Sequence, residues 1–147
     1  MSGVTVRSQP VRIMHTMIRV VDLDRSIRFY TLLGMRQLRR HDFPQNRFSI
    51  VMMGYGAEED SAVLEITHNW DVTSYVIGTA FGHISLATPN VYELCGDLAS
   101  HGIKVVRAPG PMRGGPTLAF IEDPDGYRIE LIEATADCPL GRYVEEV

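Results

Sequence analysis

The chain has 147 residues, 45% of them hydrophobic, and a formal net charge of −4. These values predict one compact domain or two small fused modules, and the mild acidity argues against a nucleic-acid surface, which needs a basic excess. No run of about 18 apolar residues is present, so we expect no membrane span. The first ten residues lack an apolar signal core. We therefore expect a cytoplasmic protein in which Cys95 and Cys138 are free thiols.

The first half of the chain predicts a strand, a helix and three more strands. An apolar, β-branched run at 12–20 predicts the first strand. Asp22 or Asp24 can cap the helix that follows, and Gly34 is a natural stop for it. Strand-like runs then lie at 35–43, 47–55 and 62–68.

The second half repeats this order. A strand-like run at 82–88 precedes a predicted helix within 89–102, where Asn90 is the cap, Glu93 stands at the capping-box position and Gly102 ends the helix. Strand-like runs follow at 103–108, 117–123 and 127–134, the last two joined by the turn DPDG.

Each half is thus β-α-β-β-β, at a period of about 65–70 residues. We predict an α+β fold of two βαβββ modules whose curved mixed sheets share a concave face. The expected boundaries are a disordered lead-in at 1–11, modules at 12–79 and 80–135, and a polar tail at 136–147.

Titratable residues repeat in phase with the modules. His15 and His83 lie in the first strand of each half, and Glu65 and Glu130 in the last. A carboxylate within an apolar strand is costly to bury without a counter-charge. Taken singly, a strand histidine is usually a structural or surface residue and a strand glutamate usually faces solvent. The other histidines, His41, His68 and His101, show no repeating pattern, and we expect them at the surface or at helix ends.

The joint pattern favours a metal site instead. Two imidazole nitrogens and two carboxylate oxygens suit Ni²⁺, Co²⁺, Zn²⁺ or Mn²⁺. The absence of thiolates among these residues argues against a typical structural zinc site. Strand alternation also places Arg19 on the face of His15, and Asn69 on the face of Glu65.

At these residues the sequence resembles glyoxalase I (lactoylglutathione lyase), a family of the vicinal-oxygen-chelate superfamily. The stretches that carry the resemblance are HTMIRVVDLDRSIRFYTLLGM, VMMGYG, VLEITHNW, FGHISLAT and AFIEDPDGYRIELIE. DPDGYRIEL alone indicates only the superfamily, whereas HTMIRV together with EITHN indicates glyoxalase I.

The resemblance implies a homodimer with metal sites between the subunits. His15 and Glu65 would come from one chain, and His83 and Glu130 from the other. Histidine at the first ligand position and the lack of long insertions resemble the bacterial-type enzymes activated by Ni²⁺ or Co²⁺, with Zn²⁺ also possible.

The reaction implied is isomerisation of the glutathione–methylglyoxal hemithioacetal to S-lactoylglutathione. By resemblance Glu130 is the main base and Glu65 its partner for the opposite stereochemistry, although ligand chemistry alone does not separate ligand from base. Arg19 and Asn69 match glutathione contacts of the family.

Glutathione is anionic, so its site should offer cations and amides. Arg107 and Arg113 flank the loop RAPGPMRGG and would receive the glycyl carboxylate from the other subunit; the alternative is that both are solvated loop charges. Trp70, Phe81 and the methionines Met17, Met52 and Met53 are candidates for a methyl pocket or for ordinary packing.

The helix end FYTLLGM and the segment GGPTLAFIED are each one residue shorter than the usual family pattern. We expect both losses at the helix end near Leu33 and in the loop near Pro116, because a residue lost from a strand would invert every side chain beyond it. The competing functions are a thiol transferase or epimerase on the same metal frame, a less favoured iron dioxygenase, and a metal-free drug-binding protein.

Overall fold

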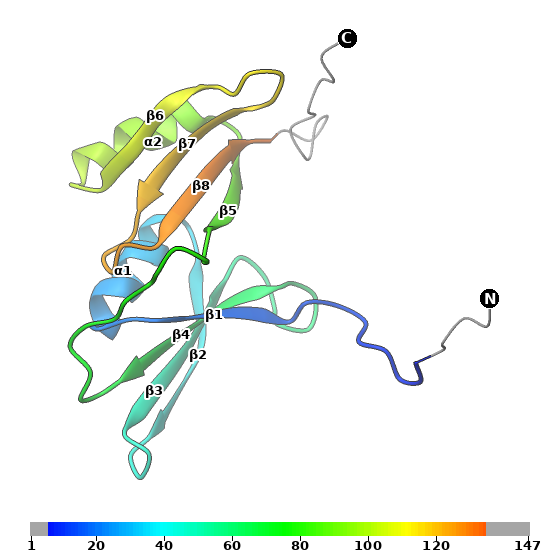
Figure 1. Cartoon of the computed structure of the whole chain (residues 1–147), viewed down its shortest axis with the longest axis vertical. Helices are drawn as coiled ribbons and strands as arrows, with labels where there is room; N and C mark the ends of the chain where they lie inside the picture. The colour runs from blue at the N-terminus through cyan, green and yellow to red at the C-terminus, as the bar shows by residue number, and fades with distance from the viewer. Residues whose placement is uncertain (1–5, 135–147) are drawn as a thin grey trace.

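The structure is a computed structural model that describes residues 6–134. The first module contains β1 (His15–Arg19), α1 (Leu23–Leu32), β2 (Arg36–Phe43), β3 (Phe48–Gly54) and β4 (Val63–Asn69). The second contains β5 (His83–Thr88), α2 (Val91–Ser100), β6 (Lys104–Pro111), β7 (Thr117–Glu122) and β8 (Arg128–Glu133) (Figure 1). The predicted duplicated α+β fold is confirmed; the predicted tail, with Cys138, lies outside the described residues.

The two sheets have the same topology. Their strand orders are β1-β4-β3-β2 and β5-β8-β7-β6, and in both the first strand runs parallel to the last while the other neighbours are antiparallel. The first and last strands of each module are therefore hydrogen-bonded neighbours. This pairing brings the early histidine and the late glutamate of each half together, although about 50 residues separate them in sequence.

Helix ends follow the sequence signals closely. The side chain of Asp22, not that of Asp24, caps α1 by accepting the backbone N–H of Arg25. Asn90 caps α2 by accepting the N–H of Glu93. The N–H of Asn90 itself donates to the Thr88 hydroxyl at 3.4 Å, and not to the Glu93 carboxylate as a capping box would require. Capping side chains satisfy backbone donors that a helix start leaves without partners.

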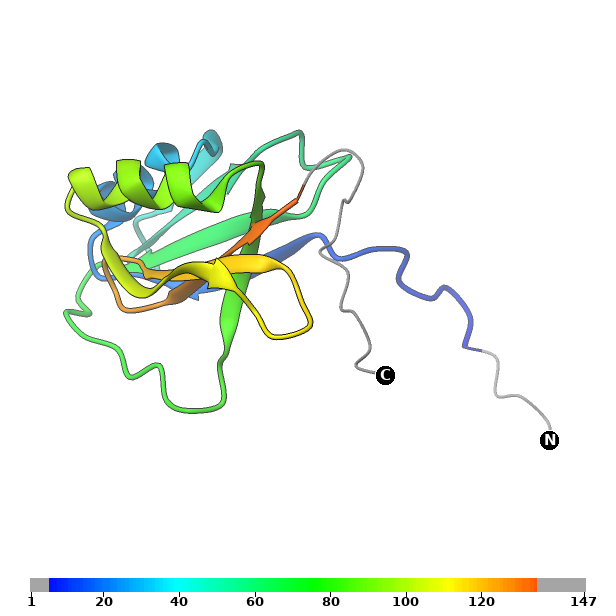
Figure 2. The ribbon, with the colours of Figure 1, turned by 90° about the horizontal axis from the view of Figure 1, so that it is seen from above.

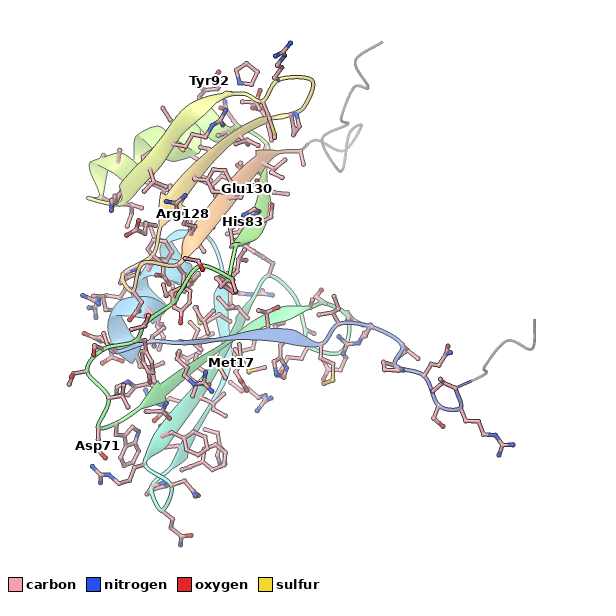
Figure 3. The ribbon with its side chains drawn as sticks, viewed as in Figure 1. Met17, Asp71, His83, Tyr92, Arg128 and Glu130 are labelled. Carbon is pink, nitrogen blue, oxygen red and sulfur yellow. The ribbon has the colours of Figure 1, made fainter. Side chains whose placement is uncertain are left out.

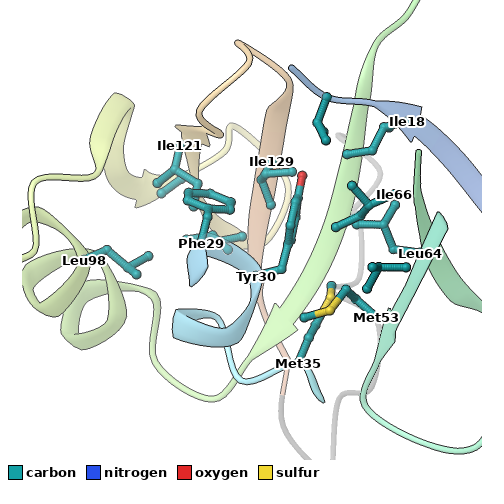
Figure 4. Close-up of a cluster of buried hydrophobic side chains, with 14 of the residues drawn as sticks. Ile18, Phe29, Tyr30, Met35, Met53, Leu64, Ile66, Leu98, Ile121 and Ile129 are labelled. Atoms are coloured by element: carbon teal, nitrogen blue, oxygen red, sulfur yellow. The ribbon is translucent and has the colours of Figure 1, made fainter. Parts of the chain in front are cut away.

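Both helices lie on one side of the molecule, above the strands in Figure 2. Buried side chains of both modules form a single core around α1, with Phe29 and Tyr30 near Ile121 and Ile129 of the second sheet (Figure 4). A fully buried large apolar side chain contributes about 1.5–3 kcal/mol. The shared core therefore fixes the two sheets relative to each other.

The strands that carry the candidate ligands keep a continuous register, β1 with β4 and β5 with β8, despite the two shortenings. The helix ends before Gly34, which has a φ of 88°, and β7 pairs continuously with β8 from Leu118 to Glu122. Register shifts occur between β2 and β3 at Gln37–Arg39, soon after the shortened helix end, and between β6 and β7 on both sides of Arg107. Within residues 6–134 no helix combines the length and the apolar character needed to cross a membrane.

Candidate metal centre

The first half-site consists of His15 on β1 and Glu65 on β4. Parallel pairing places Met17 opposite Glu65, so the imidazole and the carboxylate emerge from the same face of adjacent strands. The distance from His15 Nε2 to Glu65 Oε1 is 4.0 Å, and the side chains are 37% and 17% exposed. No hydrogen bond to the Glu65 carboxylate forms within residues 6–134, and its oxygens remain accessible to a further ligand.

The second half-site consists of His83 on β5 and Glu130 on β8. Their Nε2 and Oε2 atoms are 3.5 Å apart, and the side chains are 41% and 13% exposed. The Ser85 hydroxyl donates to Glu130 Oε1 at 3.0 Å, and the Phe120 ring packs edge-on against the imidazole at 5.2 Å. Figure 3 shows His83 and Glu130 together on neighbouring strands. The sequence pattern did not predict this hydrogen bond between Ser85 and Glu130.

The two half-sites do not meet within one chain. Among residues 6–134 no three histidine, cysteine or carboxylate side chains come close enough to hold one metal ion. In Figure 3 the second half-site lies on the upper sheet, and Met17, which shares the face of His15, lies on the lower one. Each pair is nonetheless a partly open set of one nitrogen and one carboxylate, the donor chemistry that a divalent first-row cation accepts.

Candidate substrate contacts are divided between the modules in the same way. Arg19 ends β1 and Asn69 ends β4, beside the first half-site. The Asn69 amide donates to the Tyr75 hydroxyl at 2.9 Å, which holds that amide in place. The Tyr127 hydroxyl contacts the backbone of Arg19, a feature that the sequence did not suggest.

The predicted loop around the second pair of arginines is shorter than expected. Because β6 continues to Pro111, Arg107 lies within a strand, where its Nη1 donates to the Leu118 carbonyl at 2.9 Å. Arg113 lies in the short turn before β7. A strand position gives Arg107 a more fixed backbone than a solvated loop would, while Arg113 remains at a turn.

Most of the aromatic and methionine side chains considered for a methyl pocket pack against other residues of the chain. Met52 and Met53 are 1% and 0% exposed. The Trp70 indole donates to the Ser49 hydroxyl, and Phe81 packs edge-on against Tyr127. Of these side chains, Met17 is the one that is both exposed and on the face of His15.

The remaining histidines make local contacts: His41 and His101 are exposed, as predicted, whereas His68 is half-buried. His41 packs against Phe43 on β2, His68 Nδ1 lies 3.1 Å from the Val20 carbonyl, and His101 caps the end of α2. None of the three approaches a half-site closely enough to form a metal group within the described part of the chain.

Comparison with known proteins identifies the class. Residues 12–131 match the Glyoxalase/Bleomycin resistance protein/Dioxygenase superfamily. This match spans both modules and all four candidate ligands. The chain belongs to this superfamily.

Its relatives define the family more narrowly. The chain is 50% identical over 126 residues to a probable lactoylglutathione lyase of Synechocystis, covering 84% of this chain and 96% of that protein. It is 52% identical to the lactoylglutathione lyase of Salmonella typhimurium, covering 84% and 93%. The chain is a member of the lactoylglutathione lyase (glyoxalase I) family of enzymes.

Solved structures agree with this assignment. Glyoxalase I from Zea mays superposes with a TM-score of 0.82 and 43% identity, covering 84% of this chain and 45% of that longer one. The trypanothione-dependent glyoxalase I of Leishmania major superposes with a TM-score of 0.76 and 47% identity, covering 84% and 86%.

Proposed function

We propose that the protein isomerises the glutathione–methylglyoxal hemithioacetal to S-lactoylglutathione with a bound divalent cation, and so detoxifies methylglyoxal in the cytoplasm. The observation that carries this proposal is the pair of in-phase half-sites, His15 with Glu65 and His83 with Glu130, in a chain about 50% identical to named lactoylglutathione lyases. Two half-buried carboxylates, each beside an imidazole, have no evident use in a drug-binding or sequestering protein.

We further propose that the active unit is a homodimer in which each site combines the first half-site of one chain with the second half-site of the other. Each half-site offers one nitrogen and one carboxylate, and one chain does not bring the two together within its described residues. A two-fold axis that faces one sheet with the partner's other sheet generates two identical sites of two nitrogens and two carboxylates. In such a symmetric dimer each metal ion has four protein ligands, and no other side chain is required to hold it.

We propose Ni²⁺ as the cation, then Co²⁺, with Zn²⁺ as a third candidate, because His15 at the first ligand position resembles the bacterial-type enzymes that Ni²⁺ or Co²⁺ activates; the two nitrogens and two carboxylates by themselves suit all three ions. When bound, the cation would act as a Lewis acid and stabilise the negative charge that develops on the substrate during proton transfer, a contribution of several kcal/mol. All four ligands would be provided by His15, Glu65, His83 and Glu130.

The chain's own carboxylates move the proton. Glu130 takes it from the carbon that bears sulfur and returns it to the neighbouring carbon, through a cis-enediolate. The Ser85 hydroxyl donates to Glu130 Oε1 at 3.0 Å and so orients this carboxylate, which is the preorganisation that proton transfer requires. Glu65 acts on the opposite stereochemistry.

Substrate binding uses both chains. Arg19 and Asn69 lie beside the first half-site, where they can meet the carboxylate and amide groups of glutathione. Arg107 and Arg113 of the second chain receive the glycyl carboxylate. Arginine suits this task because its guanidinium can bind a carboxylate through two parallel hydrogen bonds.

One experiment tests the proposed function. The protein is stripped with a chelator, reloaded with Ni²⁺, Co²⁺ or Zn²⁺, and assayed for thioester formation from methylglyoxal and glutathione. We expect loss of activity on stripping and the fullest recovery with Ni²⁺. Inactivity with every metal would exclude the lyase, and activity with Zn²⁺ alone would exclude only the nickel assignment.

A further inference from the structure

Within residues 6–134, strand β1, which carries His15 and Arg19, has a neighbouring strand on one side only. It pairs with β4, and the N–H of Val20 donates to the Thr67 carbonyl of that strand. Backbone groups alternate in direction along a strand, so those of Arg19 and Val21 point away from β4. Edge groups of this kind need other partners.

Side chains from the turn that precedes β8 supply those partners. The Tyr127 hydroxyl donates to the Arg19 carbonyl at 2.8 Å and accepts the Arg19 N–H at 3.3 Å. Asp125 Oδ1 accepts the N–H of Val21 at 2.9 Å. Two side chains thus take the place of the missing strand beside Arg19, the last residue of β1, and beside Val21, two residues further along the chain.

The turn that carries these side chains is firmly seated on α1. Asp123 Oδ2 accepts the buried Tyr30 hydroxyl at 2.8 Å, and Asp125 Oδ2 lies 3.3 Å from the Ser26 hydroxyl. Asp123 Oδ1 also accepts the N–H of Tyr127, and Gly126 allows the tight turn with a φ of 94°. These contacts fix the backbone at Tyr127, and the side chain extends from there to β1.

The Tyr127 side chain is also held by packing and lies next to a cavity. Its ring packs edge-on against Phe81 at 5.8 Å. Burial raises the pKa of the Tyr127 hydroxyl, so the group stays protonated and can donate at neutral pH. Tyr127 also lines a cavity of about 210 Å³ together with Met17, Arg19 and Phe81, on the face of the first half-site.

We propose that Tyr127 is a positioning residue for substrate binding: its hydroxyl holds the backbone of Arg19 so that the guanidinium meets the anionic end of the thiol cosubstrate. This inference rests on the proposed function. Without the hydroxyl, the last residue of β1 loses both partners on its open edge and frays, and the guanidinium then spends less time in the bound orientation. Because Tyr127 is not placed at the reacting carbons, it should affect binding and not the chemical step.

The test compares Tyr127→Phe with the wild-type holoenzyme. The phenylalanine ring keeps the packing against Phe81 and removes only the hydroxyl. We expect KM for the hemithioacetal, and Kd for the non-reacting thioether S-methylglutathione, to rise about three- to tenfold, the effect of one lost hydrogen bond. The value of kcat should change less than about twofold.

Two controls separate positioning from general damage. Tyr55→Phe removes another hydroxyl that donates to a backbone carbonyl, that of Leu33 at 2.9 Å, and should leave KM and Kd unchanged. In an Arg19→Ala background, Tyr127→Phe should weaken binding no further, because the side chain that it positions is gone. Hydrogen exchange of the segment that contains Arg19 should be faster in Tyr127→Phe than in the wild type, and unchanged in Tyr55→Phe.

The outcomes are distinguishable. If the wild-type protein is inactive with every metal, the proposed function is overturned, and so is the role of Tyr127 in substrate binding. Active wild type with unchanged KM and Kd in Tyr127→Phe would overturn the inference alone. A fall in kcat at constant KM, or an equal loss in the Arg19→Ala background, would also overturn it.

Discussion

The division of the metal ligands between two chains predicts subunit complementation. His15→Ala and His83→Ala each remove one ligand from both sites of a homodimer, so each variant alone should be nearly inactive. In a heterodimer of the two, one site receives both altered halves, and the other receives the intact His15 of one chain and the intact His83 of its partner. Activity should therefore return without any wild-type chain being present.

The expected magnitude follows from counting sites. A purified heterodimer has one intact site out of two and should show about half the wild-type kcat per dimer, with an unchanged KM. The two variants are co-expressed with different affinity tags, purified in sequence for both tags and loaded with Ni²⁺. Thioester formation and the bound nickel per dimer are then measured.

The matched control pairs two defects of the same half-site. In a heterodimer of His15→Ala with Glu65→Gln, every site contains one altered first half, so no activity should return. Equal recovery in both heterodimers would refute an origin in shared sites. A failure of His15→Ala with His83→Ala to recover, in a dimer that still forms, would refute the proposed division of the ligands between chains.

Three further predictions concern single residues. Glu130→Gln should lower kcat at least about a hundredfold, as for loss of a general base, whereas Glu133→Gln, three residues along β8 and on its other face, should be close to wild type in the same assay. Tyr30→Phe should lower the free energy of unfolding by about 1–3 kcal/mol in urea titrations, because it leaves the buried Asp123 carboxylate without its hydroxyl donor; no change would contradict that role. Burial raises the pKa of Asp123, so the native state holds this proton more tightly than the unfolded state does. The free energy of unfolding should therefore decline as pH rises from about 4 through the native pKa. Asp123→Asn should flatten that decline when the free energy of unfolding is measured at several pH values.

The local elements were predictable because short-range chemistry determines them. Asp22 and Asn90 cap helices by bonds to residues three positions on, and Gly34 and Gly102 end those helices with positive φ. The period-two pattern of the strands then gave the faces. Because the duplication repeats these signals, the βαβββ order could be predicted twice from one sequence.

The in-phase histidines and glutamates were also visible in sequence, since a repeat places equivalent positions in equivalent strands. What the sequence could not give was the pairing of first and last strands within each sheet, which sets His15 beside Glu65 and His83 beside Glu130. Parallel pairing across a whole module depends on the packing of the core and not on any local signal.

The tertiary structure alone decided how the two modules meet. Tyr127 follows a turn that reads as an ordinary DPDG, and its contact with Arg19 joins residues 108 positions apart. The Ser85 bond to Glu130 spans 45 positions. The sequence by itself thus determined the elements, their duplication and the donor set, because these depend on neighbouring residues and on the repeat. The side-chain contacts that hold the donors and Arg19 in place depend on how distant segments pack, and no periodicity encodes them.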